Sequence, residues 1–288
     1  MSIKIVTDSA CDLSIEYVKK NNIEVLPLLV NINGEFIKDD LGQTISYNEF
    51  YKLIRDGAMP STTQVNVGAF MEVFKESIKK SEDILYIGLS SALSGTYNSS
   101  VKAKEIILED YKNANIYTID SLSVSVGEGL LVYKAVELAK EGKDISTIVN
   151  EIEKIKKKVI HSIIVDDLNH LKRGGRVSGA VAAVGSLLNI KPSLKIDDEG
   201  KVVAGEKIKG RKRAIKYLLN EVKEKAVNIE DQVIFICNAD CLEDAEDLKT
   251  MILQEIKPKD IIINNIGSVI GSHGGPGTLA TVFIGDKR

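Results

Sequence analysis

Three clusters of polar side chains contain the residue types that could bind an anion. They are Pro60–Gln64, Ser90–Thr96 and Gly271–Thr278, and the last of them includes His273. Hydroxyl groups and free backbone N–H groups at the start of a helix bind a carboxylate or a phosphate. We therefore expect an anion near Ser94, where the next predicted helix begins. Helix capping, a common role of Ser and Thr, is the simpler explanation of each cluster taken alone.

The presence of serine and histidine in these clusters requires that a hydrolase be considered. The nucleophile elbow of such enzymes has the pattern G-x-S-x-G. The stretch Gly88–Ala92 departs from it at the last position, and the residue two places before Ser94 is Ala92. No orienting acid is visible for a pair formed by Ser94 and His273. A serine hydrolase or acyltransferase that uses Ser94 and His273 is therefore the alternative hypothesis, and we predict no catalytic residues.

Two arginines flank a Gly-Gly turn in the segment Lys172–Arg176. Guanidinium groups suit bidentate contact with a phosphate or a carboxylate. We expect Arg173 and Arg176 to lie at the mouth of a site and to contact a partner or a phosphate, with ordinary surface as the alternative. A second basic cluster, Lys207–Arg213, is typical of a solvated face.

No metal ion and no cofactor is expected from the remaining motifs. Cys237 and Cys241 are not completed by a second pair, as a zinc site would require. The segment Gly271–Gly277 lacks the Lys-Ser/Thr end of a P-loop. Three aspartates could bind magnesium, but an Asp at a strand end before Ser is more often a helix cap; they are Asp8, Asp12 and Asp120.

The composition is that of an ordinary globular protein. The 288 residues include 44% hydrophobic and 27% charged residues, and at roughly 100–200 residues per domain the length fits one large domain or two modest ones. A net charge of −3 does not indicate a surface that binds nucleic acid. Three cysteines make no disulfide framework, and the first residues run directly into a strand-like segment. We therefore expect a cytoplasmic protein.

Three long stretches of the chain carry no charged side chain. Ile261–Gly285 is long enough to span a membrane, but its six glycines and Pro276 favour two strands joined by a glycine-rich loop. Ile84–Val101 is rich in Ser, Gly and Thr, and Val177–Ile190 is more typical of a buried helix. We predict no membrane span. Burial explains each stretch taken singly, but three in one chain favour a neutral, apolar ligand cavity.

Strands and helices alternate in the first half of the chain. Short apolar runs predict the strands, and apolar residues at i, i+3, i+4 and i+7 predict the helices between them. The alternation predicts an α/β fold with a mainly parallel sheet covered by helices on both faces. The expected strands are Ile3–Thr7, Val25–Ile32, Ile84–Leu89 and Ile116–Ile119. Two helices are expected after the capping residues Asp12 or Ser14 and Ser46, and the others begin at about Val67, Tyr97, Val124 and Ile145.

The pattern changes after the lysine-rich segment Lys154–Lys158. Strand Val159–Val165 is followed by Lys191–Ile196 and Lys201–Ile208, which are expected to pair around a turn, and then by mixed helices and strands. This is an α+β pattern. We therefore predict two domains, an N-terminal α/β domain at 1–157 and a C-terminal α+β domain at 158–288.

Five motifs in this order closely resemble the DegV family, the fatty-acid-binding subunits of bacterial fatty acid kinase. The resemblance spans nearly the whole chain. One position departs from the family pattern, because Val65 stands where family members commonly have proline. The motifs are Val6–Leu13, Pro60–Gln64, Leu93–Tyr97, Arg173–Arg176 and His273–Gly277.

The resemblance implies a carrier rather than an enzyme. It implies two α/β-type domains that hold one long-chain fatty acid in a tunnel between them. The hydroxyl groups of Thr62 and Ser94 would bind the carboxylate, with His273 close behind them. An ATP-dependent kinase subunit would then phosphorylate that carboxylate, and transient contact with a membrane surface is expected. Neither nucleic acid nor a cofactor is expected as a partner.

Overall fold

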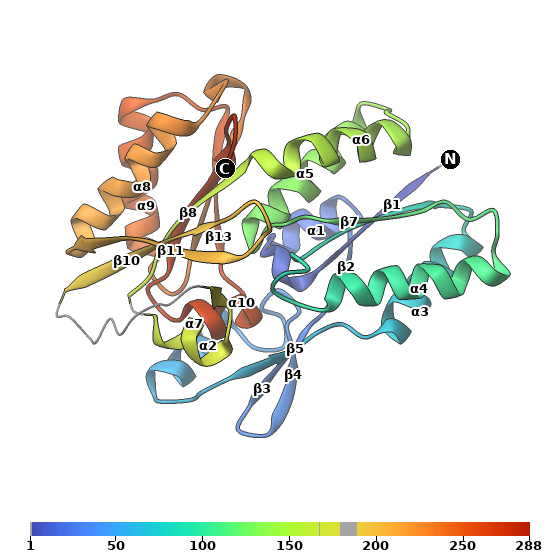
Figure 1. The fold of residues 1–288 in the computed structure, drawn as a ribbon, viewed down its shortest axis with the longest axis horizontal. Coiled ribbons are helices and arrows are strands. Elements are labelled where there is room, and N and C mark those ends of the chain that lie inside the picture. Colours follow the sequence, from blue (N-terminus) through green and yellow to red (C-terminus); the bar gives the residue numbers. More distant parts are fainter. Residues whose placement is uncertain (1, 167, 179–188) are drawn as a thin grey trace.

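The first of three sheets is parallel and has four strands. The computed structural model describes residues 2–166, 168–178 and 189–288. Strands β1 (Ile3–Asp8), β2 (Glu24–Leu26), β6 (Asp83–Gly88) and β7 (Ile116–Asp120) lie in the order β2-β1-β6-β7 (Figure 1). This confirms the predicted parallel sheet. Two of the five motifs, Val6–Leu13 and Leu93–Tyr97, lie at the carboxyl ends of β1 and β6, the edge at which open α/β sheets bind ligands.

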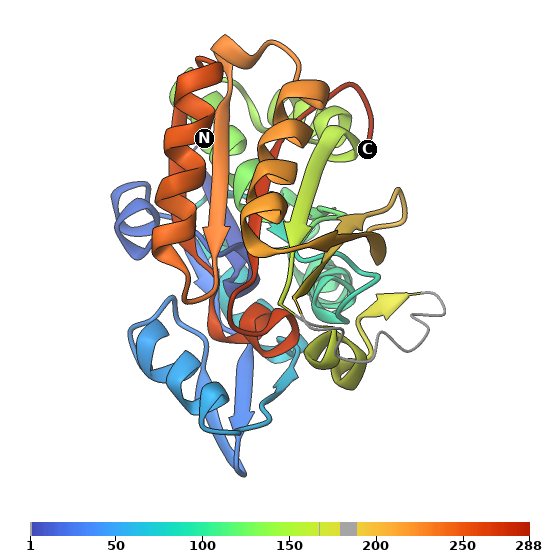
Figure 2. The same ribbon diagram turned by 90° about the vertical axis from the view of Figure 1, so that its left-hand side faces the viewer.

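The second sheet is mixed and holds most of the later strands. Its order is β13-β12-β14-β8-β10-β11-β9, with β10 and β11 paired antiparallel as predicted. Figure 2 shows helices α8 (Arg211–Lys225) and α9 (Leu242–Glu255) side by side over this sheet. Its strands are β8 (Val159–Ile164), β9 (Val177–Ser178), β10 (Ile190–Ile196), β11 (Val202–Lys209), β12 (Val233–Asn238), β13 (Asp260–Asn265) and β14 (Leu279–Ile284).

A third, small antiparallel sheet projects from the other two. It contains β3 (Leu29–Ile32), β4 (Glu35–Lys38) and β5 (Ser61–Thr63), in the order β4-β3-β5. The hairpin predicted at Asn33-Gly34 is confirmed, and both residues have the positive φ that its tight turn requires. The single strand predicted over Val25–Ile32 is wrong. It breaks after Leu26, because Pro27 has no N–H to donate to a sheet, and the two halves belong to different sheets.

Helix α5 (Val126–Lys140) lies between the two large sheets. It packs against β1 and β6 on one side and against β8, β12 and β14 on the other, and α3 and α4 cover the parallel sheet on the side away from α5 (Figure 1). Most of the α5 side chains are buried. The other helices are α1 (Ile15–Lys20), α2 (Tyr47–Arg55), α3 (Val67–Lys79), α4 (Thr96–Asp110), α6 (Ile145–Ile155), α7 (Asn169–Gly174) and α10 (Ser268–Gly274).

Local capping signals place several helix starts. The Ser46 side chain accepts from the backbone N–H of Glu49 and begins α2, as predicted. Ser14 in the same way caps α1, so that Asp12, the other candidate, has a different role. The glycine-rich loop predicted inside Ile261–Gly285 is wrong in part, because it contains the short helix α10 between β13 and β14.

One hydrophobic core joins the two halves of the chain. It contains Val132 of α5 together with Ile87 of the parallel sheet and Phe235 of the mixed sheet. The boundary at residue 157 stays a prediction.

The helix predicted over Val177–Ile190 falls mostly outside the described residues, and its ends belong to β9 and β10. In the described ranges, no helix is both long and apolar enough to cross a bilayer.

Candidate functional site

A cavity of about 370 Å³ lies where the three sheets meet. Thr62, Ser94 and His273, which are far apart in the sequence, all line it. Its volume is within the roughly 300–1,000 Å³ range of small-molecule pockets. The aliphatic side chains that form most of its wall are Leu28, Leu89, Leu93, Val124, Ile163, Leu171, Val202, Val269 and Ile270.

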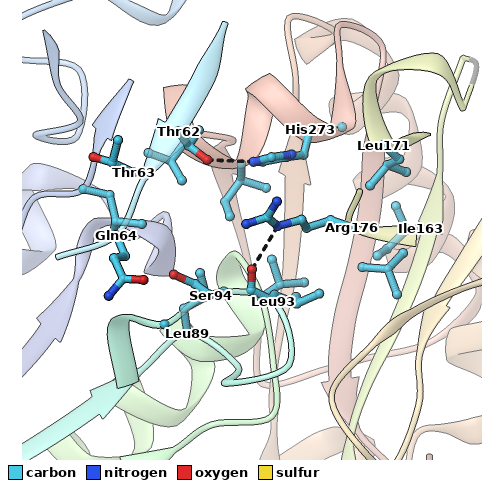
Figure 3. A pocket seen from close by; sticks show the side chains of 17 residues that line it. Thr62, Thr63, Gln64, Leu89, Leu93, Ser94, Ile163, Leu171, Arg176 and His273 are labelled. Carbon is cyan, nitrogen blue, oxygen red and sulfur yellow. Dashed lines mark hydrogen bonds between the residues drawn. The ribbon is translucent and has the colours of Figure 1, made fainter. Parts of the chain in front are cut away.

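The polar side chains gather in one part of this cavity (Figure 3). Thr62 of β5 and His273 of α10 meet there, with 2.9 Å between Thr62 Oγ1 and His273 Nε2. Ser94, from the loop between β6 and α4, places its Oγ 2.9 Å from Thr96 Oγ1 and accepts from the Thr96 N–H. The structure therefore brings together the three residues that the motifs single out.

His273 is held as a neutral ring. Burial, together with the nearby guanidinium groups of Arg176 and Arg173, lowers its pKa to about 4. Its Nδ1 is buried and has no hydrogen-bond partner in the described part of the chain. The ring also packs against a glycine, since a Cβ on Gly174 would lie 2.2 Å from Nδ1. A larger residue at Gly174 would push the imidazole away from Thr62.

A second, polar hollow of about 260 Å³ adjoins the cavity and shares Thr62, Arg176 and His273 with it. Arg173 lines only this second hollow, whereas Arg176 lines both. The remaining residues around it are Met59, Pro60, Ser61, Gly174 and Ser272.

The two arginines are held differently. Arg176 reaches between His273 and Leu93 (Figure 3), and its Nε donates to the Leu93 carbonyl oxygen at 3.0 Å. Its Nη1 donates to the Gly174 carbonyl. Arg173 Nη2 lies 3.2 Å from His170 Nδ1. Among the described residues, neither arginine is paired with a carboxylate.

The departure at Val65 has a local explanation. Its side chain is buried, and its backbone N–H donates to Thr96 Oγ1 at 3.3 Å. A proline could not make this bond, because it has no N–H. Thr96 is also the partner of Ser94, so Val65 ties the segment after Gln64 to the loop that carries Ser94.

Sequence reasoning missed the walls of the cavity. Ile163, Val124 and Val202 come from separate parts of the chain, and aliphatic residues in strands and loops are ordinary core residues by their pattern. Only the lack of charge in Ile84–Val101 and Ile261–Gly285 indicated them, since Leu89, Leu93 and Val269 lie in those stretches.

The geometry does not favour the alternative hydrolase. The Ser94 hydroxyl bonds to Thr96 and not to His273. The Nδ1 of His273, which would need an acidic partner in a triad, has none within the described segments. Among residues 2–166, 168–178 and 189–288 there is also no cluster of three His, Cys, Asp or Glu side chains that could hold a metal ion.

Comparisons with known proteins agree over the full chain. The family model described as "Uncharacterised protein, DegV family" matches residues 2–286. A DegV domain-containing protein of Clostridium perfringens is 47% identical over 284 residues, which are 99% of this chain and 98% of that protein.

Two solved structures have the same fold. A fatty-acid-binding DegV family protein from Thermus thermophilus has a TM-score of 0.89 and 30% identity, over 99% of this chain and 100% of that one. A stearic-acid-binding protein from Eubacterium ventriosum has a TM-score of 0.87 and 26% identity, over 98% of each chain. With the family model, the Clostridium relative and the fold in agreement, the chain belongs to the DegV family.

Proposed function

We propose that this protein binds one long-chain fatty acid, with the acyl tail in the cavity and the carboxylate at Thr62 and Ser94. The observation that carries the proposal is a cavity that combines aliphatic walls with two hydroxyl groups and a neutral imidazole in one place. The relatives described as binding fatty acids support this class of ligand.

The tail supplies most of the binding free energy. Burial of one methylene group contributes about 0.8 kcal/mol, so a tail of roughly fifteen contributes on the order of 10 kcal/mol before the cost of ordering it. The aliphatic wall makes this contribution without hydrogen bonds. It therefore holds the tail but does not fix where along the cavity the carboxylate lies.

The polar residues fix the carboxylate. A carboxylate oxygen needs donors, so the Thr62 and Ser94 hydroxyls each turn a proton toward it. Thr62 then accepts from His273, which requires the proton of the neutral ring to be on Nε2. Nδ1, which has no partner among the described residues, is then an acceptor. A charge-assisted hydrogen bond of this kind contributes about 1.5–3 kcal/mol.

The protein presents this carboxylate to an ATP-dependent kinase subunit, which transfers the γ-phosphoryl group to a carboxylate oxygen. The polar hollow beside the head group supports this step, because Arg173 and Arg176 line it and can neutralise a phosphate. The carrier itself contributes no catalytic residue.

We place this reaction in the cytoplasm, with brief contact at a membrane surface when the ligand is exchanged. Met59, which lies at the rim of the polar hollow and is 71% exposed, suits such contact.

The first test uses the protein as purified and after removal of lipid by refolding. Native mass spectrometry is expected to show about one fatty acid per chain. The refolded protein should bind a saturated fatty acid more tightly than the alcohol with the same tail, since the alcohol lacks the charge. A bare chain that takes up no fatty acid on refolding would overturn the proposal.

The second test concerns presentation. With a competent kinase subunit and ATP, the loaded protein should yield an acyl phosphate, and the ester of the same fatty acid should yield none. Hydrolysis of a chromogenic ester by the protein alone would instead support the hydrolase.

A further inference from the structure

The motif at the end of β1 has no role in the proposed contacts with the ligand, yet its polar side chains are buried. Asp8 and Ser9 are fully buried and Asp12 is 2% exposed. Each accepts a backbone N–H from a distant segment: Asp8 from Leu89, Ser9 from Leu28 and Asp12 from Gly267. The three distances are 3.1, 3.1 and 2.8 Å.

Each of these three segments leads to one polar residue of the cavity. Leu89 precedes the loop that carries Ser94. Leu28 precedes β3, in which Val30 pairs with Thr62 of β5. Gly267 is the N-cap of α10, which carries His273 in its last turn. One short motif is therefore bonded to the supports of all three.

Helix α10 depends on such support more than the other segments do. It has seven residues, and isolated helices of that length are not stable in water. Its first N–H groups have no partners within the helix. Asp12 accepts from Gly267, and Asp39 accepts from the N–H groups of Ser268 and Val269 and from the Ser268 hydroxyl.

The space around this helix start is closely filled by the two carboxyl groups. A Cβ on Gly267 would lie 2.8 Å from Asp12 Oδ1 and 3.2 Å from Asp39 Oδ1. Asp12 also accepts from the Ser125 hydroxyl, which fixes its second oxygen. Burial raises the pKa of both carboxyl groups, that of Asp39 to about 6. The fold thus keeps two acids where burial is unfavourable to their charge, at the base of the helix that carries His273.

We propose that Asp12 and Asp39 are positioning residues for the head-group site: they hold the start of α10 so that His273 reaches Thr62. This inference rests on the proposed function, because it concerns the alignment of the residues that receive the carboxylate. Neither residue lines the cavity, so both act through His273.

The test compares two near-isosteric variants, Asp12→Asn and Asp39→Asn, with Asp144→Ala as a control. Asp144 caps α6 by accepting from Thr147 at 2.9 Å, and its removal destabilises a helix start that does not carry a cavity residue. Each variant is titrated with a saturated fatty acid and with the alcohol of the same tail. The second readout is the pKa of His273, measured from its imidazole resonances by NMR.

We expect each Asn variant to lose about tenfold in affinity for the acid and less than twofold for the alcohol. The His273 pKa should rise from about 4 toward 6.5 as the ring loosens, and Asp144→Ala should change neither quantity. A purely structural role would lower both affinities together. If both Asn variants fold and keep the wild-type ratio of acid to alcohol affinity and the wild-type His273 pKa, the inference is wrong. A wild-type protein that does not distinguish acid from alcohol would overturn the proposed head-group site itself.

Discussion

The two adjoining hollows differ in the kind of recognition they provide, although they share Thr62, Arg176 and His273. The larger one is enclosed mainly by Leu, Ile and Val side chains, and the smaller one by two arginines, serines and the histidine. Burial of apolar surface is proportional to area and has no direction, whereas hydrogen bonds and charges have one. In the proposed function, the apolar wall therefore supplies the affinity and the polar wall the orientation, and the two walls meet at the shared residues.

The largest effect is expected from filling the apolar cavity. Ile163 of β8 lines it, and Ile163→Trp should exclude about four methylene groups of the tail. At about 0.8 kcal/mol each, this lowers the affinity for a fatty acid by roughly two-hundredfold. Acid and alcohol should be affected alike. Displacement of a fluorescent fatty acid measures the affinity, and Ile163→Val is the control.

If Ile163→Trp keeps its melting temperature and still binds a long-chain acid with wild-type affinity, the tail lies elsewhere. The apolar cavity would then be a packing defect and not a ligand site.

The next effect concerns the hydroxyl groups at the polar end. Thr62→Val keeps the shape of the side chain and removes the hydroxyl, and Ser94→Ala does the same at the other residue. Each should lower the affinity for the acid by about ten- to a hundredfold, corresponding to about 1.5–3 kcal/mol. The affinity for the corresponding alcohol should fall by much less, because the alcohol has no charge to assist the bond. Equal losses for both ligands would show that these residues contact the tail.

The two arginines give a matched pair that separates the hollows. Arg176→Ala removes the hydrogen bond to the Leu93 carbonyl, next to Ser94, and should lower fatty-acid affinity by about five- to tenfold, as expected for about 1 kcal/mol. Arg173→Ala should leave that affinity unchanged, because Arg173 lines only the polar hollow. Both changes should reduce acyl-phosphate formation with a kinase subunit.

A loss of fatty-acid binding in Arg173→Ala would place that guanidinium at the carboxylate. Full acyl-phosphate formation in the double variant would make both arginines ordinary surface.

The smallest effect is a predicted insensitivity to pH. Because the pKa of His273 is lowered to about 4 and that of Asp39 is raised only to about 6, the ring stays neutral and Asp39 stays mostly charged between pH 6.5 and 8, and fatty-acid affinity should change by less than twofold. A ring with the ordinary pKa of about 6.5 would become charged in this range and bind the carboxylate more tightly as the pH falls. Calorimetric titration at several pH values measures this.

The same lowered pKa predicts a pH dependence of stability. The His273 imidazole binds a proton more tightly in the unfolded chain than in the native protein. The free energy of unfolding is therefore highest above about pH 6.5 and falls as the pH is lowered toward 4. The variant His273→Gln should show a smaller loss over that range. The comparison is needed because the raised pKa of Asp8 and of Asp39, both about 6, acts in the opposite direction.

Much of the fold could be predicted because its signals are local. The cap at Ser46, the turn at Asn33-Gly34 and the period of α3 each depend on a few neighbouring residues. Two elements could not be predicted in this way. Pro27 divides an apolar run between two sheets, and α10 forms in a glycine-rich segment because Asp12 and Asp39, more than 200 positions earlier, accept its first N–H groups.

The polar residues Thr62, Ser94 and His273 could be identified without the fold, because the motifs around them are short and ordered along the chain. The fold was needed to show that Thr62 and His273, separated by 211 positions, lie 2.9 Å apart. It was also needed to show that Ile163, Val124 and Val202 face one cavity. The physical reason is that hydrogen-bonding groups reveal themselves by type and by local spacing. An aliphatic side chain has the same pattern in the sequence whether it packs against another side chain or lines a ligand cavity, and only the convergence of three sheets distinguishes the two.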